Sequence, residues 1–144
     1  MSRYKVLLVI FSLVCISFGK IIQGQTNEEQ SQVKNAHKNC QNDANTYVEP
    51  ILLEAMSKGT LSEDPQLKLH MLCLAKGLNI IDKIGHLNKD FMKQKFLSHY
   101  EGDDLKEMEK CLEEKTSPEE TAWEFYKCHF STAKKLLQKQ IRVK

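Results

Sequence analysis

Apolar residues recur at helical spacing along most of the chain, and prolines mark where several helices begin. Pro50, Pro65 and Pro118 each precede a segment rich in Leu, Met or aromatic residues, and proline is favoured in the first turn of a helix. Asp64 and Ser117 stand where they can cap the helices that follow. We predict helices near residues 27–44, 50–58, 65–78, 88–100, 103–115 and 117–129, with a seventh within 130–142.

The segment 65–78 is apolar around most of its circumference. The segment 103–115 has a single apolar stripe, which predicts a helix on the surface. A helix with two apolar stripes is contacted from several sides, so we expect 65–78 to form the central wall of the fold. No segment alternates apolar and polar residues over a strand length. The predicted fold class is all-α. The two stripes of 65–78 consist of Leu67, Met71, Leu74 and Leu78, and of Leu69, Leu72 and Ala75.

The first residues have the pattern of a secretory signal peptide. A short basic head precedes about 13 apolar residues, a run too short to span a membrane. We predict that residues 1–24 are removed, with cleavage after Gly24 or instead after Gly19. The remaining residues, 25–144, are expected to form a single helical domain that is secreted to the extracellular space.

Charge and motifs exclude several classes of function. The formal net charge is +2 for the whole chain and falls close to zero without the signal peptide, so nucleic acid is not an expected partner. The chain has no GxSxG or HExxH motif and no phosphate-binding glycine loop. We therefore expect neither an enzyme nor a cofactor.

Four cysteines remain once Cys15 leaves with the signal peptide. Two HxxC pairs, His37/Cys40 and His70/Cys73, have a spacing that would allow zinc binding on a helix face. An even number of cysteines in a secreted chain is more typical of disulfides. Four cysteines allow three pairings, and spacing alone does not choose among them.

The signal peptide, the six helices and the cysteine spacing together resemble the pheromone- and general-odorant-binding proteins of insects. KLHMLCLAKGLNIID resembles the third-helix segment of that family. Typical members have six cysteines, bridged first to third, second to fifth and fourth to sixth. In this chain Leu69 and Glu119 stand at the second and fifth positions, which are partners of each other, as in the four-cysteine "minus-C" members. The resemblance implies the bridges Cys40–Cys73 and Cys111–Cys128. Because cysteines in an oxidising compartment are expected to form disulfides, we expect no metal site.

The same resemblance implies a carrier. Its helices would enclose a buried apolar pocket that binds small hydrophobic, odorant- or pheromone-like molecules and transports them through aqueous fluid. A membrane receptor is a further candidate partner, and the expected state is a monomer or weak homodimer. The alternative is a secreted, cytokine-like helical signalling ligand that acts by receptor binding. The candidate pocket residues are Met56, Leu61, Leu74, Leu78, Phe91, Phe96, Trp123, Tyr126 and Phe130.

Two further expectations concern flexibility and the tail. Without a second-to-fifth bridge, 65–78 and the start of 117–129 would be held together by packing alone and would move more easily against each other. The tail, 130–144, is basic and amphipathic. Three interpretations of it stay open: a seventh helix over the pocket mouth or the body, a solvated tail, or a segment that touches anionic membranes.

Overall fold

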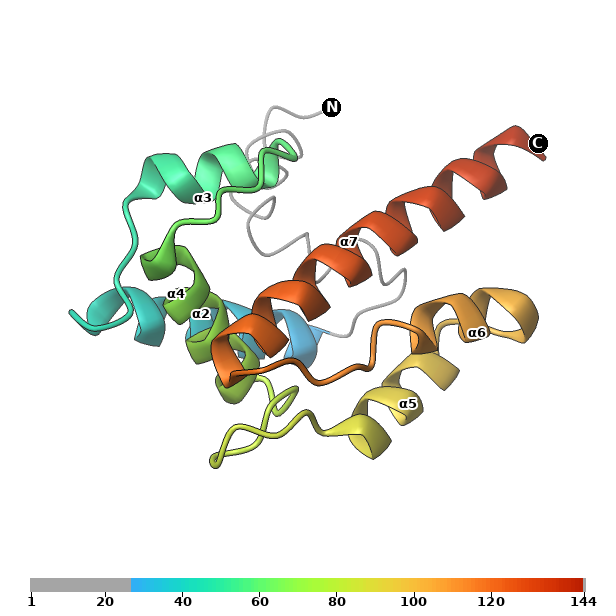
Figure 1. Cartoon of the computed structure of the whole chain (residues 1–144). Helices are drawn as coiled ribbons and strands as arrows, with labels where there is room; N and C mark the ends of the chain where they lie inside the picture. The colour runs from blue at the N-terminus through green and yellow to red at the C-terminus, as the bar shows by residue number, and fades with distance from the viewer. Residues whose placement is uncertain (1–26, 144) are drawn as a thin grey trace.

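The fold is built from helices. A computed structural model describes residues 27–143, and the predicted signal peptide lies outside this part of the chain. Within the described residues there are six helices and no strand, so the predicted all-α class is confirmed. Figure 1 shows their arrangement. The helices are α2 (Asn27–Asn42), α3 (Pro50–Ser57), α4 (Pro65–Gly77), α5 (Lys89–Leu97), α6 (Gly102–Glu109) and α7 (Pro118–Arg142).

The starts of α4 and α7 are set by capping side chains. The Asp64 carboxylate accepts hydrogen bonds from the backbone N–H groups of Gln66 and Leu67, at 2.8 and 3.1 Å. The Ser117 hydroxyl oxygen accepts one from the N–H of Glu120 at 3.2 Å. These N–H groups have no carbonyl partner in the first turn of a helix, so the caps stabilise the predicted starts.

The C-terminal helix is longer than predicted. The helices expected at 117–129 and within 130–142 form one continuous helix, α7, of 25 residues. The sequence has no glycine or second proline within it, and Ala133 and Leu136 are buried, so nothing ends the helix near residue 130. Its last turns reach the edge of the molecule (Figure 1), where Lys139 forms an ion pair with Asp104 of α6 at 3.1 Å. The tail is therefore helical as far as Arg142 and in part packed on the body.

Helix α6 is shorter than the predicted 103–115. After Glu109, the N–H groups of Cys111 and Leu112 donate to carbonyls three residues back, at 3.1 and 3.0 Å. This tighter hydrogen-bonding pattern is common in a final helical turn, and the helix ends there. The chain then leads to α7 with Cys111 already beside Cys128.

Helix α4 lies at the centre of the fold, as its two apolar stripes predict. It packs most extensively against α7 and next against α2. The buried residues of α7 include the large Trp123, Phe125 and Tyr126, whereas those of α2 are the small Ala36 and Cys40. The buried residues of α4 itself are Leu67, His70, Met71, Leu72, Leu74 and Ala75.

Two disulfides fasten the helices, with the pairing that the resemblance implies. Cys40 of α2 is bonded to Cys73 of α4, with an S–S distance of 1.99 Å. Cys111, just after α6, is bonded to Cys128 of α7 at 2.03 Å. Each disulfide connects a pair of helices that also pack together. The disulfides therefore fix α2 against α4 and the end of α6 against α7.

Helices α4 and α7 are joined by ion pairs close to the positions of the absent bridge. Lys68, next to Leu69, lies 2.7 Å from Glu120, which follows Glu119. Lys68 also lies 2.8 Å from Glu63, a residue of the loop before α4. The expectation that packing alone holds this junction is therefore wrong, because charged neighbours of the two non-cysteine positions bind each other.

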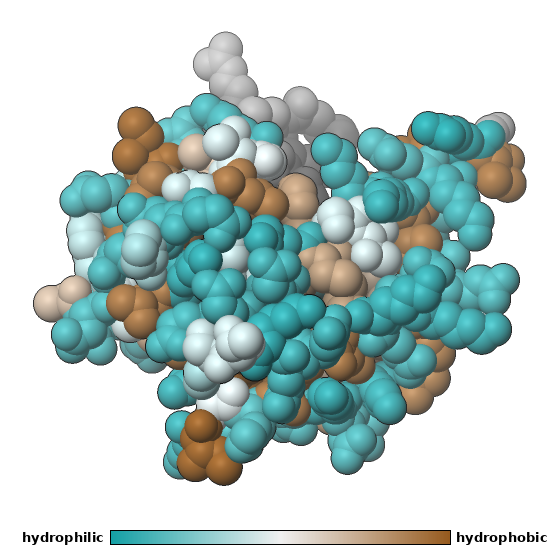
Figure 2. Space-filling view, in the orientation of Figure 1, coloured by the Kyte–Doolittle hydropathy of each residue, from teal (hydrophilic) through white to brown (hydrophobic). Residues whose placement is uncertain are grey.

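The face of the molecule drawn in Figure 2 is mainly hydrophilic. Figure 2 shows one face on which hydrophobic residues are scattered in separate groups rather than gathered in one continuous patch. None of the described helices combines the length and the apolar character that crossing a membrane requires.

Candidate ligand-binding site

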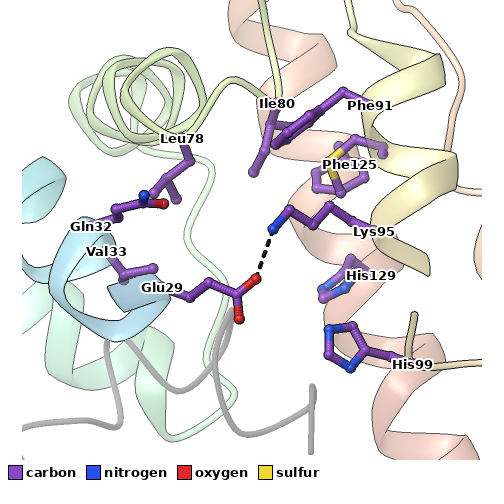
Figure 3. A pocket seen from close by; sticks show the side chains of 11 residues that line it. Glu29, Gln32, Val33, Leu78, Ile80, Phe91, Lys95, His99, Phe125 and His129 are labelled. Atoms are coloured by element: carbon purple, nitrogen blue, oxygen red, sulfur yellow. Dashed lines mark hydrogen bonds and ion pairs between the residues drawn. The ribbon is translucent and has the colours of Figure 1, made fainter. Parts of the chain in front are cut away.

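A cavity of about 90 Å³, partly open to solvent, lies where four helices meet. Figure 3 shows side chains from α2, α5, α7 and the end of α4 pointing into it. More than half of the lining is apolar, and the polar groups include an ion pair that crosses the space. The lining residues are Glu29, Gln32, Val33, Leu78, Ile80, Phe91, Met92, Lys95, His99, Phe125 and His129.

The turn that ends α4 supplies two apolar walls of the cavity. Asn79 has a positive φ of 59°, the left-handed conformation that commonly closes a helix. The N–H of Ile80 then donates to the carbonyl of Ala75 at 2.9 Å, which turns the chain back across the helix end. This turn places Leu78 and Ile80, on either side of Asn79, in the same lining.

Lys95 and Glu29 face each other across the cavity. The Lys95 ammonium on α5 lies 2.7 Å from the Glu29 carboxylate on α2, and Figure 3 shows this contact spanning the open space. The same ammonium lies 5.7 Å from the centroid of the Phe91 ring, within the range of a cation–π interaction. The site therefore carries one charged pair within a mainly apolar lining.

His129 contributes an uncharged ring to the lining. Its side chain is almost fully buried, and burial lowers its pKa to about 4, so it is neutral at pH 7. The ring stacks on Phe96 and Phe125, with centroid distances of 5.8 and 5.6 Å. At neutral pH this part of the wall behaves as an aromatic surface.

Two of the nine predicted pocket residues, Leu78 and Phe91, line this cavity. Five others are buried in the core, and two are half-buried against it. On α7, Trp123 stacks on Tyr126 with centroids 5.9 Å apart, on a face that periodicity places about 100° from Phe125 and His129. The seven predicted residues outside this lining are Met56, Leu61, Leu74, Phe96, Trp123, Tyr126 and Phe130.

Nine lining residues were not among the sequence candidates. The i, i+4 pairs Glu29/Val33 and Phe125/His129 were visible as helical spacings. Helical spacing shows which residues share a face of a helix but not whether that face lines a cavity. The spacing of these pairs therefore could not identify them as lining residues. The other missed residues are Gln32, Ile80, Met92, Lys95 and His99.

The two HxxC pairs come together between α2 and α4, but as a disulfide with neighbouring histidines. The rings of His37 and His70 lie 5.3 Å apart, edge to face. His70 Nδ1 donates a hydrogen bond to the carbonyl of Thr46 at 2.7 Å. Among the described residues, no three His, Cys, Asp or Glu side chains are grouped so that they would hold a metal ion.

Comparison with known proteins identifies the family. The PBP/GOBP family matches residues 23–132, which is most of the chain and includes every lining residue of the cavity. The chain belongs to the PBP/GOBP family. The predicted resemblance to pheromone- and general-odorant-binding proteins is thereby confirmed, and members of this family are small-molecule carriers rather than enzymes.

Two relatives of this PBP/GOBP protein come from Tenebrio molitor. The B1 protein is 30% identical over 109 residues, covering 74% of this chain and 82% of the relative. The B2 protein is 31% identical over 109 residues, covering 74% and 84%. No solved structure gives a significant match to the chain.

Proposed function

We propose that this PBP/GOBP protein is a secreted carrier that binds small hydrophobic molecules in the cavity between α2, α4, α5 and α7 and transports them through aqueous fluid. The observation that carries the proposal is an apolar cavity within the region that matches a family of small-molecule carriers. Two disulfides are consistent with an extracellular location, because such bonds persist in oxidising compartments. The cytokine-like alternative draws no support from this family.

Binding would be driven by removal of apolar ligand surface from water. At about 25 cal/mol per Å², burying roughly 200 Å² of ligand contributes about 5 kcal/mol before the entropic costs of binding are subtracted. The aromatic rings of Phe91 and Phe125 and the flexible Met92 side chain are suited to apolar ligands of varied shape.

The cavity as it stands is smaller than the roughly 300–1,000 Å³ typical of sites for drug-sized ligands. A ligand larger than the present 90 Å³ therefore requires lining side chains to move apart. Phe96, one of the predicted pocket residues, stacks on His129 of the lining. We expect it to join the lining when the cavity widens around a ligand.

The test is a fluorescence titration with N-phenyl-1-naphthylamine, an apolar probe that brightens when it leaves water. We expect saturable binding by the folded protein. Val33→Phe, which adds an aromatic ring inside the cavity, is expected to weaken probe binding by about tenfold, the equivalent of roughly 1.4 kcal/mol. Val143→Phe makes the same change at a position that is 83% exposed and outside the lining, and it should leave binding within about twofold.

Absence of saturable probe binding by well-folded wild-type protein would overturn the proposed function. If Val33→Phe binds the probe as tightly as Val143→Phe and wild type, the binding site lies elsewhere in the molecule. Thermal melts of each variant establish that the comparison is made between folded proteins.

A further inference from the structure

Lys95 stands out among the groups that line the cavity. It is the only lysine or arginine among the described lining residues, and its side chain is 40% exposed. Its ammonium is held by the Glu29 carboxylate and by the face of Phe91. Lys93 on the same helix is exposed and lies outside the lining, so the position of Lys95 in the cavity is not shared by its basic neighbour.

An ammonium in a mainly apolar site needs a counter-ion, because partial removal from water costs free energy that an opposite charge offsets. Glu29 supplies that charge in the structure, at 2.7 Å. Any ligand that fills the space between α2 and α5 must therefore either leave this ion pair in place or replace its carboxylate.

The position of Glu29 in its helix favours its negative charge even without Lys95 beside it. Glu29 belongs to the first turn of α2, where the exposed N–H groups of the helix favour a negative charge. Its side chain is 25% exposed, and a rotation that kept the carboxylate near the same helix end would vacate the space beside Lys95. Lys95 would keep its contact with Phe91 but would lose its counter-ion.

We propose that the ligand is an apolar molecule with one terminal carboxylate, such as a medium-chain fatty acid, and that its carboxylate replaces that of Glu29 beside Lys95. This inference rests on the proposed carrier function and specifies the chemical class of the cargo. The ligand chain would lie against Ile80, Phe91 and Phe125. No covalent step is involved.

The charge balance favours a monocarboxylate over other head groups. A carboxylate carries one charge and restores the neutral pair, whereas a phosphate monoester brings about 1.5 to 2 negative charges to a single lysine. An alcohol is uncharged and leaves Lys95 needing Glu29 as its counter-ion, so the ion pair would continue to occupy part of the space. Lys95 is thus a specificity-determining residue that distinguishes acids from alcohols of equal length.

The experiment measures how dodecanoate and dodecan-1-ol displace N-phenyl-1-naphthylamine from wild type, Lys95→Met, Lys93→Met and Glu29→Gln at pH 7.5. Methionine keeps an apolar stem without the charge. Lys95→Met is expected to weaken dodecanoate binding by about tenfold, in the range for loss of a hydrogen bond to a charged group. Dodecan-1-ol binding should not weaken, because Lys95→Met also removes the ion pair that limits the space for an alcohol. The ratio of dodecanoate to dodecan-1-ol affinity should therefore fall by at least about tenfold. Lys93→Met should alter neither ligand.

Glu29→Gln is expected to act in the opposite direction. It removes the carboxylate that competes with the ligand, so dodecanoate should bind several-fold more tightly. This variant decides the question even if Lys95→Met fails to fold, because an unchanged affinity of Glu29→Gln for dodecanoate overturns the inference. An unchanged ratio of dodecanoate to dodecan-1-ol affinity in folded Lys95→Met also overturns it.

The outcomes separate this inference from the proposed function. If wild type binds the probe and dodecan-1-ol but not dodecanoate, the carrier function stands and the carboxylate inference fails. If wild type binds neither the probe nor either ligand, the carrier function fails and the inference fails with it.

Discussion

Helix α4 is held by two neighbours in two different ways. On the α2 side, the Cys40–Cys73 disulfide joins the helices covalently, with His37 and His70 packed edge to face nearby. On the α7 side, the contact is more extensive but carries no covalent bond. We call the first the α2–α4 junction and the second the α4–α7 junction.

Charged groups take the place of a bridge at the α4–α7 junction. Glu63 accepts hydrogen bonds from Lys68 and, at 3.1 Å each, from Lys127 and the Trp123 indole N–H. Those hydrogen bonds, led by the one from Lys68, lower the pKa of Glu63 to about 2. Lys68 also reaches Glu120 of α7. Each of these contacts can break and re-form, which a disulfide does not do on the timescale of ligand binding.

The contrast between a disulfide at one junction and non-covalent contacts at the other indicates which pair of helices can move apart when a ligand enters. The cavity is lined by α2 and the end of α4 on one side and by α5 and α7 on the other. Because α2 and α4 are tied to each other by a disulfide, widening of the cavity is expected to occur by movement of α7 against α4. Three predictions test this contrast.

The largest effect is expected from removal of the α2–α4 disulfide. The bridge closes a loop with a sequence separation of 33, so Cys40→Ala with Cys73→Ala should lower the free energy of unfolding by about 4 kcal/mol on chain-entropy grounds. Cys111→Ala with Cys128→Ala is the matched control; its separation of 17 predicts a loss of about 3 kcal/mol. Urea unfolding measures both, and a smaller loss for the first pair would contradict the importance given to the α2–α4 junction.

Addition of a bridge at the α4–α7 junction should have an effect of the opposite sign. Leu69→Cys with Glu119→Cys would close a loop of about 50 residues, worth at most about 4 kcal/mol, and engineered bridges often deliver less. We expect a higher Tm and a narrower range of ligand sizes. Leu69→Ser with Glu119→Ser provides the control without a bridge. A double cysteine variant that oxidises fully but melts at the wild-type temperature would show that this junction is already rigid.

The smallest expected effect is the change in unfolding free energy with pH, and it differs between the two junctions. Burial lowers the pKa values of His37 and His70, so the unfolded chain takes up protons first and stability falls as the pH drops below about 6.5. Glu63, whose pKa is lowered to about 2, stabilises the fold above its unfolded pKa, and that stabilisation is lost only as the pH falls from about 4.5 toward 2.

His70→Asn keeps a donor for the Thr46 carbonyl but does not titrate. We expect it to flatten the decline in unfolding free energy between pH 6.5 and 5, measured by urea unfolding at each pH, by an amount below that of either disulfide. His37 and His129, whose pKa values are also lowered, still titrate in this variant and account for the remaining decline in unfolding free energy. Glu63→Gln is the control and should leave the slope in this range unchanged. Equal slopes for His70→Asn and wild type would exclude His70 as a source of acid sensitivity at the α2–α4 junction.

Local signals in the sequence predicted the helices well where those signals are strong. Asp64 and Ser117 cap α4 and α7 as expected, because capping involves residues only two or three positions apart. The ends of α6 and α7 were less predictable. The end of α6 lies beside a disulfide to α7, and the continuation of α7 is accompanied by burial of Ala133 and Leu136.

The sequence by itself determined the all-α class, the helix starts and the family, because these depend on periodicity, capping and cysteine spacing along the chain. The tertiary structure decided which faces meet. It placed Phe125 and His129 at the cavity and Trp123 with Tyr126 in the core, although both pairs are apolar stripes of the same helix. It also paired Glu29 with Lys95, 66 positions apart. Helical spacing defines a face but not its partner, and the partner depends on how the helices pack together.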